Sequence, residues 1–390
     1  MRIAIDIRKI NEFGVGTYIW NLVRNLENID RRNEYLLIGS RRHFHELGPL
    51  PSNFNQLYQP DEETLWGNNC TIPLSLRRNG VDVFHVPHHE APFFVPCRLV
   101  VTMHDCVHLL FPPEGSSKFQ KYSLYLRTRR VVERASHVVA VSKSTKDDLI
   151  DIFHTNEAKI SVVYNALDER FAPATPAAEE RTRVLERYQL NDPFILYSGK
   201  IRPHKNLHRL IEAFAVLKTE LVDDARYKNI KLIIIGDELS KHQYLRLTVI
   251  RSGVQHDVRF FGFVPYSTLR VFYQSASLFA FPSLHEGFGL PPLEAMANGL
   301  PVLASNTSSL PEVLEEAAVL VTPENVFEIA RGMKLILSDE ALRRQLIQKG
   351  MQQVAKFSWN VAAERVVQIY ESAASQTAPV FTESRSTSMD

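Results

Sequence analysis

Two glutamates, two glycines and two prolines stand close together in one segment of the chain. The segment reads Glu-Gly-Phe-Gly-Leu-Pro-Pro-Leu-Glu, with seven residues between Glu286 and Glu294. The apolar run 276–281 before it is typical of a buried strand, and the residues after the prolines suit a short helix that ends at Gly299. Residues 302–304 then suit another strand. The sequence therefore predicts a strand, a glycine loop, a short helix and a second strand.

The residue types in this segment fit a ligand that carries both negative charge and hydroxyl groups. At the start of a helix the backbone amides and the helix dipole favour an anion, and here those amides belong to Gly287, Phe288, Gly289 and Leu290. Carboxylates repel phosphate but accept hydrogen bonds from hydroxyl groups. Either glutamate alone is better explained as a solvated charge. The combination favours a nucleotide-sugar, whose diphosphate lies between two hydroxyl-rich groups.

The segment resembles the signature of retaining GT-B glycosyltransferases, specifically glycosyltransferase family 4 (glycosyl transferases group 1). The resemblance covers nearly the whole chain to about residue 374 and is strongest over residues 195–321. It implies an α/β fold of the GT-B type, in which two Rossmann-like domains face each other across a central cleft. The implied parts are an acceptor-binding domain (1–180), a nucleotide-sugar-binding domain (190–357), a helix returning to the first domain (358–374) and a Ser/Thr-rich tail expected to be disordered (377–390).

The elements that would position these residues alternate between strands and helices. Apolar runs typical of strands occupy, in chain order, residues 2–7, 35–38, 81–86, 99–103, 138–141, 160–164, 194–198, 230–235, 258–264, 276–281, 302–304 and 318–321. Between the two series, residues 172–192 shift in composition and include a linker. Such alternation predicts two parallel sheets, and ligands bind at the carboxyl ends of the strands in such sheets.

A glycine pair, Gly14 and Gly16, lies between the first predicted strand and an amphipathic helix that starts at Thr17. The pair does not complete the dinucleotide-binding fingerprint, because Ile19 stands where a third glycine or alanine is expected. A turn that packs helix against strand is one explanation of the pair. The resemblance to family 4 implies the other, a loop against the donor phosphates and the acceptor.

Two polar residues, His104 and Asp105, directly follow the predicted strand 99–103. A single histidine at a strand end is more often structural than catalytic. The resemblance implies that His104 lies near the donor sugar, and Asp105 could orient the imidazole or the acceptor. We therefore expect His104 in the site together with Glu286.

Basic residues follow the predicted strand 194–198 in the sequence Gly-Lys-Ile-Arg-Pro-His-Lys-Asn. A glycine turn that carries positive charge to a helix start suits a diphosphate. Lys205 matches the lysine of the family pattern. Either Lys200 or Arg202 could correspond to the first basic residue of that pattern. Farther on, Val264 lies in a stretch that the resemblance implies holds the nucleotide base.

Composition limits the class of protein. The chain has 390 residues, 45% hydrophobic and 23% charged, which is enough for two ordinary globular domains. A formal net charge of +1 gives no argument for nucleic acid as a partner. Three cysteines without metal-ligand spacing fit a reduced compartment. The first residues enter a strand pattern without the shape of a signal peptide, and no apolar run approaches the roughly 20 residues of a membrane span. We expect a cytoplasmic protein, with the inner face of the membrane as the alternative place.

Residues 114–134 form a basic amphipathic segment with interspersed aromatic side chains. One explanation is a solvated helix face that packs Leu124, Leu126 and Val131 inward. The other is peripheral contact with anionic lipid headgroups or an anionic lipid-linked acceptor, a use that the resemblance implies for this region.

The resemblance implies transfer of a sugar, with retention of anomeric configuration, from a nucleotide-sugar to a saccharide or lipid-linked acceptor in polysaccharide or lipopolysaccharide assembly. It implies neither a metal ion nor another cofactor, and no Asp-x-Asp stands at a predicted strand end. Glu286 would bind hydroxyls of the donor sugar, Glu294 the ribose diol, and Lys205 the leaving diphosphate. The motif 199–206 with His104 looks most like bacterial mannosyltransferases, so GDP-mannose is the expected donor.

Other functions remain open at this point. UDP-glucose or another UDP-sugar could replace GDP-mannose as donor. An epimerase or a phosphorylase could share the fold, although a pyridoxal-dependent phosphorylase needs a Schiff-base lysine and a much longer chain. A non-catalytic subunit that binds a nucleotide-sugar is the remaining alternative.

Overall fold

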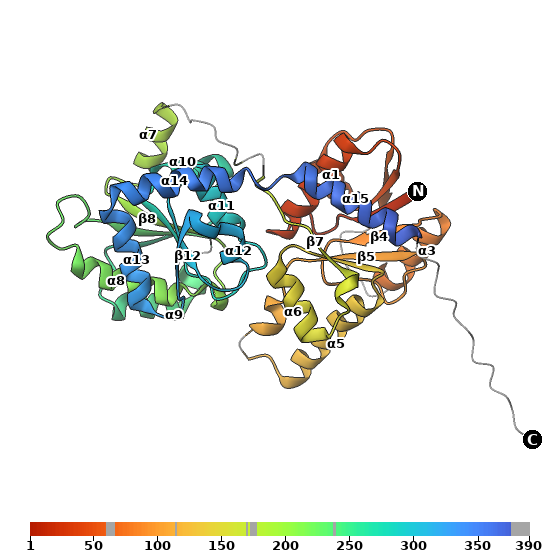
Figure 1. Ribbon diagram of the computed structural model, residues 1–390, viewed down its shortest axis with the longest axis horizontal. Coiled ribbons are helices and arrows are strands. Elements are labelled where there is room, and N and C mark those ends of the chain that lie inside the picture. Colours follow the sequence, from red (N-terminus) through yellow and green to blue (C-terminus); the bar gives the residue numbers. More distant parts are fainter. Residues whose placement is uncertain (60–66, 114, 169–170, 172–177, 237–238, 376–390) are drawn as a thin grey trace, which may run out of the picture.

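The computed structural model describes residues 1–59, 67–113, 115–168, 171, 178–236 and 239–375 (Figure 1). The predicted disordered tail (377–390), residue 114 of the basic segment and residues 172–177 of the predicted linker lie outside the described residues. Two α/β units are seen side by side, each with a central sheet flanked by helices (Figure 1). The predicted fold class, with two Rossmann-like domains, is confirmed.

Within the described residues, the first sheet has seven parallel strands in the order β3-β2-β1-β4-β5-β6-β7. In chain order its strands are β1 (Arg2–Asp6), β2 (Glu34–Gly39), β3 (Phe54–Tyr58), β4 (Val83–Val86), β5 (Arg98–Met103), β6 (His137–Ala140) and β7 (Ile160–Val162). Its helices are α1 (Val15–Ile29), α2 (Arg41–Leu47), α3 (Ile72–Arg78), α4 (Val107–Leu110), α5 (Lys118–Arg134) and α6 (Lys143–Phe153). The sequence predicts all of these strands except β3, an edge strand whose side chains are mostly exposed.

The second sheet has six parallel strands within the described residues, in the order β10-β9-β8-β11-β12-β13. They are β8 (Phe194–Ser198), β9 (Lys231–Ile235), β10 (Val258–Phe261), β11 (Leu278–Phe281), β12 (Val302–Ser305) and β13 (Ala318–Val321). The helices are α7 (Ala178–Arg187), α8 (Leu207–Glu220), α9 (Gln243–Arg251), α10 (Tyr266–Ser275), α11 (Leu290–Ala297), α12 (Leu310–Leu314), α13 (Val326–Ser338) and α14 (Glu340–Val354).

The central strands are continuous apolar runs because helices cover both faces of each sheet. β11, with the sequence Leu-Phe-Ala-Phe, is fully buried, and so are the last four residues of β9. Strands buried on both faces have no reason to alternate polar with apolar side chains. This burial fixes the carboxyl ends of β8 and β11, from which the loops of the candidate site start.

The last described helix, α15 (Trp359–Ser375), packs against α1 of the first domain (Figure 1). Its Tyr370 hydroxyl lies 2.6 Å from Nδ1 of His85, and both side chains are fully buried. The chain thus starts and ends its described part in the same domain. None of the helices within the described ranges combines the length and the apolar character that a membrane span requires.

Candidate functional site

A cavity of about 460 Å³ lies between the two domains, at the carboxyl ends of strands from both sheets. Its walls include most of the residues that the sequence singled out, namely Gly14, His104, Asp105, Lys200, Arg202, Lys205, Val264, Glu286, Gly287, Phe288, Gly289, Leu290 and Glu294. Gly16 is not among the lining residues. A Cβ on Gly16 would lie 2.0 Å from the carbonyl oxygen of Ile10, so close packing in the turn explains this glycine.

Lys205 and Glu286 form an ion pair in the lining of this cavity, with Nζ of Lys205 2.5 Å from Oε1 of Glu286. Lys205 is the last residue of a short 3-10 turn (Pro203–Lys205). The turn ends at Asn206, whose backbone is in the left-handed conformation with φ of 62°. The buried Asn206 amide donates to the carbonyl oxygens of Pro282 and Pro323, so it ties the lysine turn to the strand before Glu286. An ammonium held this way can neutralise a diphosphate that enters beside it.

The first helical turn after the glycine loop belongs to α11. Gly289 caps this helix with φ of 104°, a conformation that glycine adopts without strain, and prolines occupy the first turn, where amides have no partner in the helix. Because α11 starts at the cavity, its amides and dipole favour negative charge there. Positive charge and a helix N-terminus therefore converge on one region of the site.

Glu294 lies on α11, one turn inside the helix, and its Oε2 accepts a hydrogen bond of 2.9 Å from the hydroxyl of Tyr273. Burial, and secondarily the Glu294 charge, raises the pKa of Tyr273 well above its ordinary value, so the phenol stays protonated and keeps donating. A carboxylate oriented by this hydrogen bond can still accept hydrogen bonds from the hydroxyl groups of a ligand.

His104 follows β5 and lies in the loop that faces Glu286 from the other domain. Its Nε2 is 3.0 Å from the carbonyl oxygen of Pro87. Since a carbonyl only accepts, Nε2 carries the proton in this contact. Burial lowers the pKa of His104 to about 4, so the ring is neutral near pH 7 and Nδ1 offers a lone pair to a hydroxyl donor. The Tyr18 ring packs edge-on against the imidazole at 5.0 Å.

Several lining residues were not predicted from the sequence. Phe13 of the first domain and Phe263 of the second are both more than 60% exposed, and their rings meet edge-on at 6.4 Å. The Lys200 ammonium lies 4.9 Å from the Phe13 ring. His204 also lines the cavity, and burial followed by the Lys205 charge lowers its pKa to about 4. The signal available was the position of Phe13 beside the glycine pair and of Phe263 beside Val264.

Within the described ranges, no group of three or more histidine, cysteine, aspartate or glutamate side chains is placed to hold a metal ion. The lining residues supply cations, backbone amides, two carboxylates and the neutral imidazole of His104, whose loop touches the Glu286 loop at Gly287. This arrangement can bind a phosphate-containing ligand by charge and can orient hydroxyl groups on either side of the phosphates.

Comparison with known proteins gives matches along most of the chain. The family described as "Glycosyltransferase Family 4" matches residues 14–171, and "Glycosyl transferases group 1" matches residues 179–353. The "O-antigen chain mannosyltransferase B" of Escherichia coli is 31% identical over 291 residues, which are 73% of this chain and 74% of that protein. The "Serotype-specific mannosyltransferase WbdA" of the same species is 34% identical over 276 residues, 70% of this chain. The match spans about a third of the length of WbdA, 33%.

Solved structures of similar fold include glycosyltransferases at low sequence identity. Anabaena Alr3699/HepE in complex with UDP-glucose has a TM-score of 0.74 and 18% identity, covering 95% of this chain and 100% of that one. WaaG, a glycosyltransferase involved in lipopolysaccharide biosynthesis, has a TM-score of 0.70 and 16% identity, covering 94% and 99%. These likenesses establish the arrangement of two domains.

Proposed function

The chain belongs to glycosyltransferase family 4, and on this basis we propose that it is a retaining glycosyltransferase that moves a hexose from a nucleotide-sugar to an acceptor hydroxyl. The observation that carries the proposal is the convergence of Lys205, Glu286 and the α11 N-terminus on one cavity between the domains. The neutral imidazole of His104, in a loop that touches the Glu286 loop at Gly287, favours an enzyme over a non-catalytic binding subunit.

In this proposal the second domain binds the nucleotide diphosphate. Lys205, with Arg202 and Lys200 nearby, and the amides of Gly287 to Leu290 neutralise the charge that develops as the diphosphate leaves. Preorganised donors and cations at such a position are usually a large contribution to catalysis. The protein needs no metal ion or other cofactor for this step, because its own cations and helix dipole supply the positive charge.

The carboxylates bind the hydroxyl groups on either side of the diphosphate. Glu294 accepts from the ribose diol, and Glu286 accepts from hydroxyls of the transferred sugar while Lys205 stays beside it. Nδ1 of His104 accepts a hydrogen bond from a hydroxyl group of that sugar. The acceptor hydroxyl attacks the anomeric carbon from the face that the diphosphate leaves. The new bond to the acceptor oxygen forms as the bond to the diphosphate oxygen breaks, and the hydroxyl proton passes to that departing oxygen. The anomeric configuration is therefore retained without a covalent enzyme intermediate.

Mannose from GDP-mannose is our first choice of donor, because the relatives named above as mannosyltransferases are about a third identical to this chain. A UDP-sugar is the second choice, supported by the UDP-glucose complex of the structurally similar HepE. The acceptor in the proposal is a saccharide or lipid-linked saccharide of O-antigen or similar polysaccharide assembly, and α5 provides peripheral contact with the membrane that carries it.

Calorimetric titration with GDP, UDP and ADP, without added metal, tests the donor site first. Binding of GDP alone supports GDP-mannose, whereas binding of UDP alone replaces mannose by a UDP-sugar in the proposal. Incubation with the matching nucleotide-sugar and a lipid-linked saccharide, followed by NMR of the product, then tests transfer and retention. If none of the three nucleotides binds the folded protein, the proposed function is wrong.

A further inference from the structure

The first turn of α6, in the first domain, contacts the loop that carries Glu286. The carboxylate of Glu312 on α12 accepts hydrogen bonds of 3.1 and 3.0 Å from the backbone amides of Lys143 and Ser144, which have no partner within α6. The Thr145 hydroxyl lies 3.3 Å from the carbonyl oxygen of Gly287. The second domain therefore caps a helix of the first, and that helix in turn contacts the site loop.

Ser308 holds the backbone of Glu286 from both sides. Its Oγ lies 2.7 Å from the carbonyl oxygen of Glu286 and 3.2 Å from its amide nitrogen. The same Oγ is 2.9 Å from Nδ1 of His285 and 3.1 Å from Oγ of Ser144. Ser308 has φ of 56°, an uncommon conformation for a residue with a side chain. Four contacts on one hydroxyl maintain this strained position.

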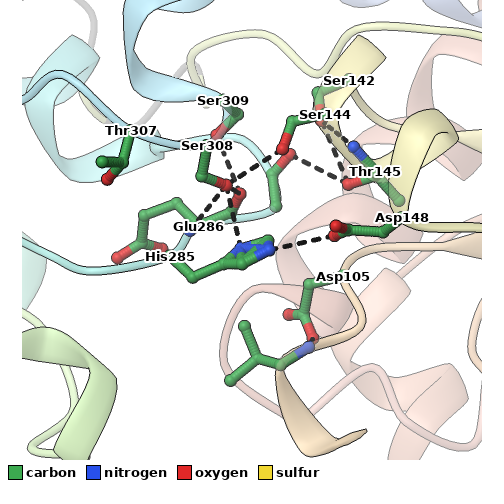
Figure 2. Close-up of polar contacts among 12 residues, drawn as sticks. Asp105, Ser142, Ser144, Thr145, Asp148, His285, Glu286, Thr307, Ser308 and Ser309 are labelled. Carbon is green, nitrogen blue, oxygen red and sulfur yellow. Dashed lines mark hydrogen bonds and ion pairs between the residues drawn. The ribbon is translucent and has the colours of Figure 1, made fainter. Parts of the chain in front are cut away.

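His285 connects this serine to the first domain. Its Nε2 lies 3.0 Å from Oδ2 of Asp148 on α6, and both side chains are at least 80% buried. In Figure 2 the imidazole points from the Glu286 loop toward Asp148, with Ser308 on its other side. The chain of contacts thus runs from Asp148 through His285 and Ser308 to the backbone of Glu286.

We propose that Asp148 is a positioning residue for the reaction, which acts through His285 and Ser308 to fix the sugar-binding carboxylate Glu286. The proposal rests on the function proposed above, because it assigns Glu286 to the donor sugar. Its consequence is that the first domain aligns a donor-binding group of the second, so the site is complete only when α6 is docked against the loop.

The position of protons in this chain explains how it fixes the loop. A hydroxyl has one proton, so Ser308 can donate to the Glu286 carbonyl only if it accepts from Nδ1 of His285. In a neutral ring Nε2 then has a lone pair 3.0 Å from Oδ2 of Asp148, and a protonated Asp148 avoids the repulsion between that lone pair and a carboxylate. Burial, and then the charges of Asp105, Asp151 and Asp147, raise the pKa of Asp148 to about 7, and burial lowers the pKa of His285.

Loss of that proton would reverse the chain. The imidazole would then carry its proton on Nε2, which faces the Asp148 carboxylate. Nδ1 would become an acceptor, and Ser308 would donate its proton to Nδ1 instead of to the Glu286 carbonyl oxygen. Other titratable groups that act electrostatically on the pair or feel its charge are Asp105, Glu286, Lys205, His204 and Cys106. Because the folded pKa of Asp148 lies above its ordinary value, the protonated arrangement weakens as pH rises through about 7.

The test compares Asp148→Ala with Lys143→Ala, which removes an exposed side chain from the same helix whose charge is not among those that raise the pKa of Asp148. We expect Asp148→Ala to speed hydrogen exchange of the Glu286 amide about tenfold and to lower kcat about tenfold, with the Kd of the nucleoside diphosphate unchanged within about twofold. Lys143→Ala should leave all three at wild-type values. Equal exchange in both variants would overturn the proposal.

Asp148→Asn keeps the size of the side chain and a hydrogen-bond donor but cannot ionise. It therefore tests the proposal if Asp148→Ala does not fold. In the wild type, exchange of residues 284–289, corrected for intrinsic rates, should rise as pH passes about 7, and Asp148→Asn should abolish that rise. An unaltered rise in Asp148→Asn would overturn the proposal. Hydrogen exchange is measured without a nucleotide-sugar, so its result does not depend on the proposed function. A wild-type protein that binds no nucleotide and transfers no sugar would refute the proposed function. The exchange comparison would still decide whether Asp148 positions the Glu286 loop.

Discussion

The carbonyl oxygen of His104 occupies the space into which a side chain on Gly287 would project, since a Cβ there would lie 1.7 Å from it. The two residues belong to different domains, and both line the cavity. Gly287 was predicted for its amide, which suits an anion. The structure adds a second reason for glycine, because a larger residue would prevent the approach of the domains at the site.

Gly287→Ala should therefore separate the His104 loop from the Glu286 loop. We expect kcat to fall by about 100-fold, because displacement of reacting groups by about 1 Å has an effect of that size. The Kd of the nucleoside diphosphate should change less, since most of its contacts lie in the second domain. Gly253→Ala, in a turn that does not line the cavity, controls for a general loss of stability. A kcat within twofold of wild type would contradict this role of the close contact.

Replacing Lys205 by alanine removes the cation beside Glu286 and leaves a buried carboxylate without that partner. We expect kcat/KM to fall by about 10²- to 10³-fold, the loss typical of one preorganised group that stabilises transition-state charge. Lys205→Arg should recover part of the activity because it keeps the charge. Steady-state kinetics with Lys228→Ala, an exposed lysine, provide the reference. Similar kinetics for the Lys205 and Lys228 variants would exclude Lys205 from the diphosphate site.

Glu294→Ala should weaken binding of the nucleoside diphosphate by about tenfold or more, because hydrogen bonds to a charged group contribute about 1.5–3 kcal/mol. Transfer should be lost together with affinity. Tyr273→Phe is the matched variant, since it removes the hydroxyl that donates to Glu294 but leaves the carboxylate. Calorimetric titration of both variants with the nucleoside diphosphate shows how much affinity comes from the Glu294 carboxylate itself and how much from its orientation by Tyr273. A protein with no transfer activity before mutation would instead favour the non-catalytic alternative.

The site loop could be predicted from the sequence because its chemistry and its geometry are local. Glu286, the glycines and Glu294 lie within nine residues of one another, and strand, loop and helix follow directly from their order. Asp148 could not be predicted, since it is 137 positions from His285 and nothing in the local sequence marks it. The contact between Phe13 and Phe263 could not be predicted either, because the two residues are 250 positions apart, although each stands beside a predicted site residue. Strand β3 was missed because only Phe54 of its five residues is buried, so its apolar pattern is weak.

Stability should fall on acidification because buried histidines are held neutral. Burial lowers the pKa of His85 to about 3, whereas an unfolded histidine takes up a proton near pH 6.5. The unfolded state thus binds more protons between these values, and the free energy of unfolding falls as pH drops below about 6.5, by about 1.4 kcal/mol per pH unit for one such group. Chemical denaturation at pH 7, 6 and 5 measures the slope.

His85→Gln should reduce that slope, although it also removes the contacts of the ring with Tyr370 and Thr102 and so lowers stability at pH 7. His256→Gln, at an exposed position, should leave the slope unchanged. If both variants keep the wild-type slope, His85 is not responsible for the acid sensitivity.

The membrane contact proposed for α5 depends on side chains that the fold leaves in solvent. Phe119 and Tyr122 are 79% and 60% exposed, and Lys118 and Lys121 stand beside them on the same exposed turns. Exposed aromatic and basic side chains together favour an interface with anionic lipid, with about 1 kcal/mol from each lysine near the surface. A solvated helix face would be expected to carry fewer exposed aromatic rings.

The double variant Phe119→Ser and Tyr122→Ser should therefore lower binding to vesicles that contain anionic lipid by about tenfold in a sedimentation assay, with transfer to a soluble acceptor unchanged. Phe327→Ser is the matched control, because Phe327 is 73% exposed on α13 of the other domain. Raising the salt concentration should weaken wild-type binding further, since screening reduces the attraction of the lysines. If the wild type does not sediment with anionic vesicles, or if the Phe327 variant loses binding equally, α5 is a solvated face and the acceptor must reach the cavity without it.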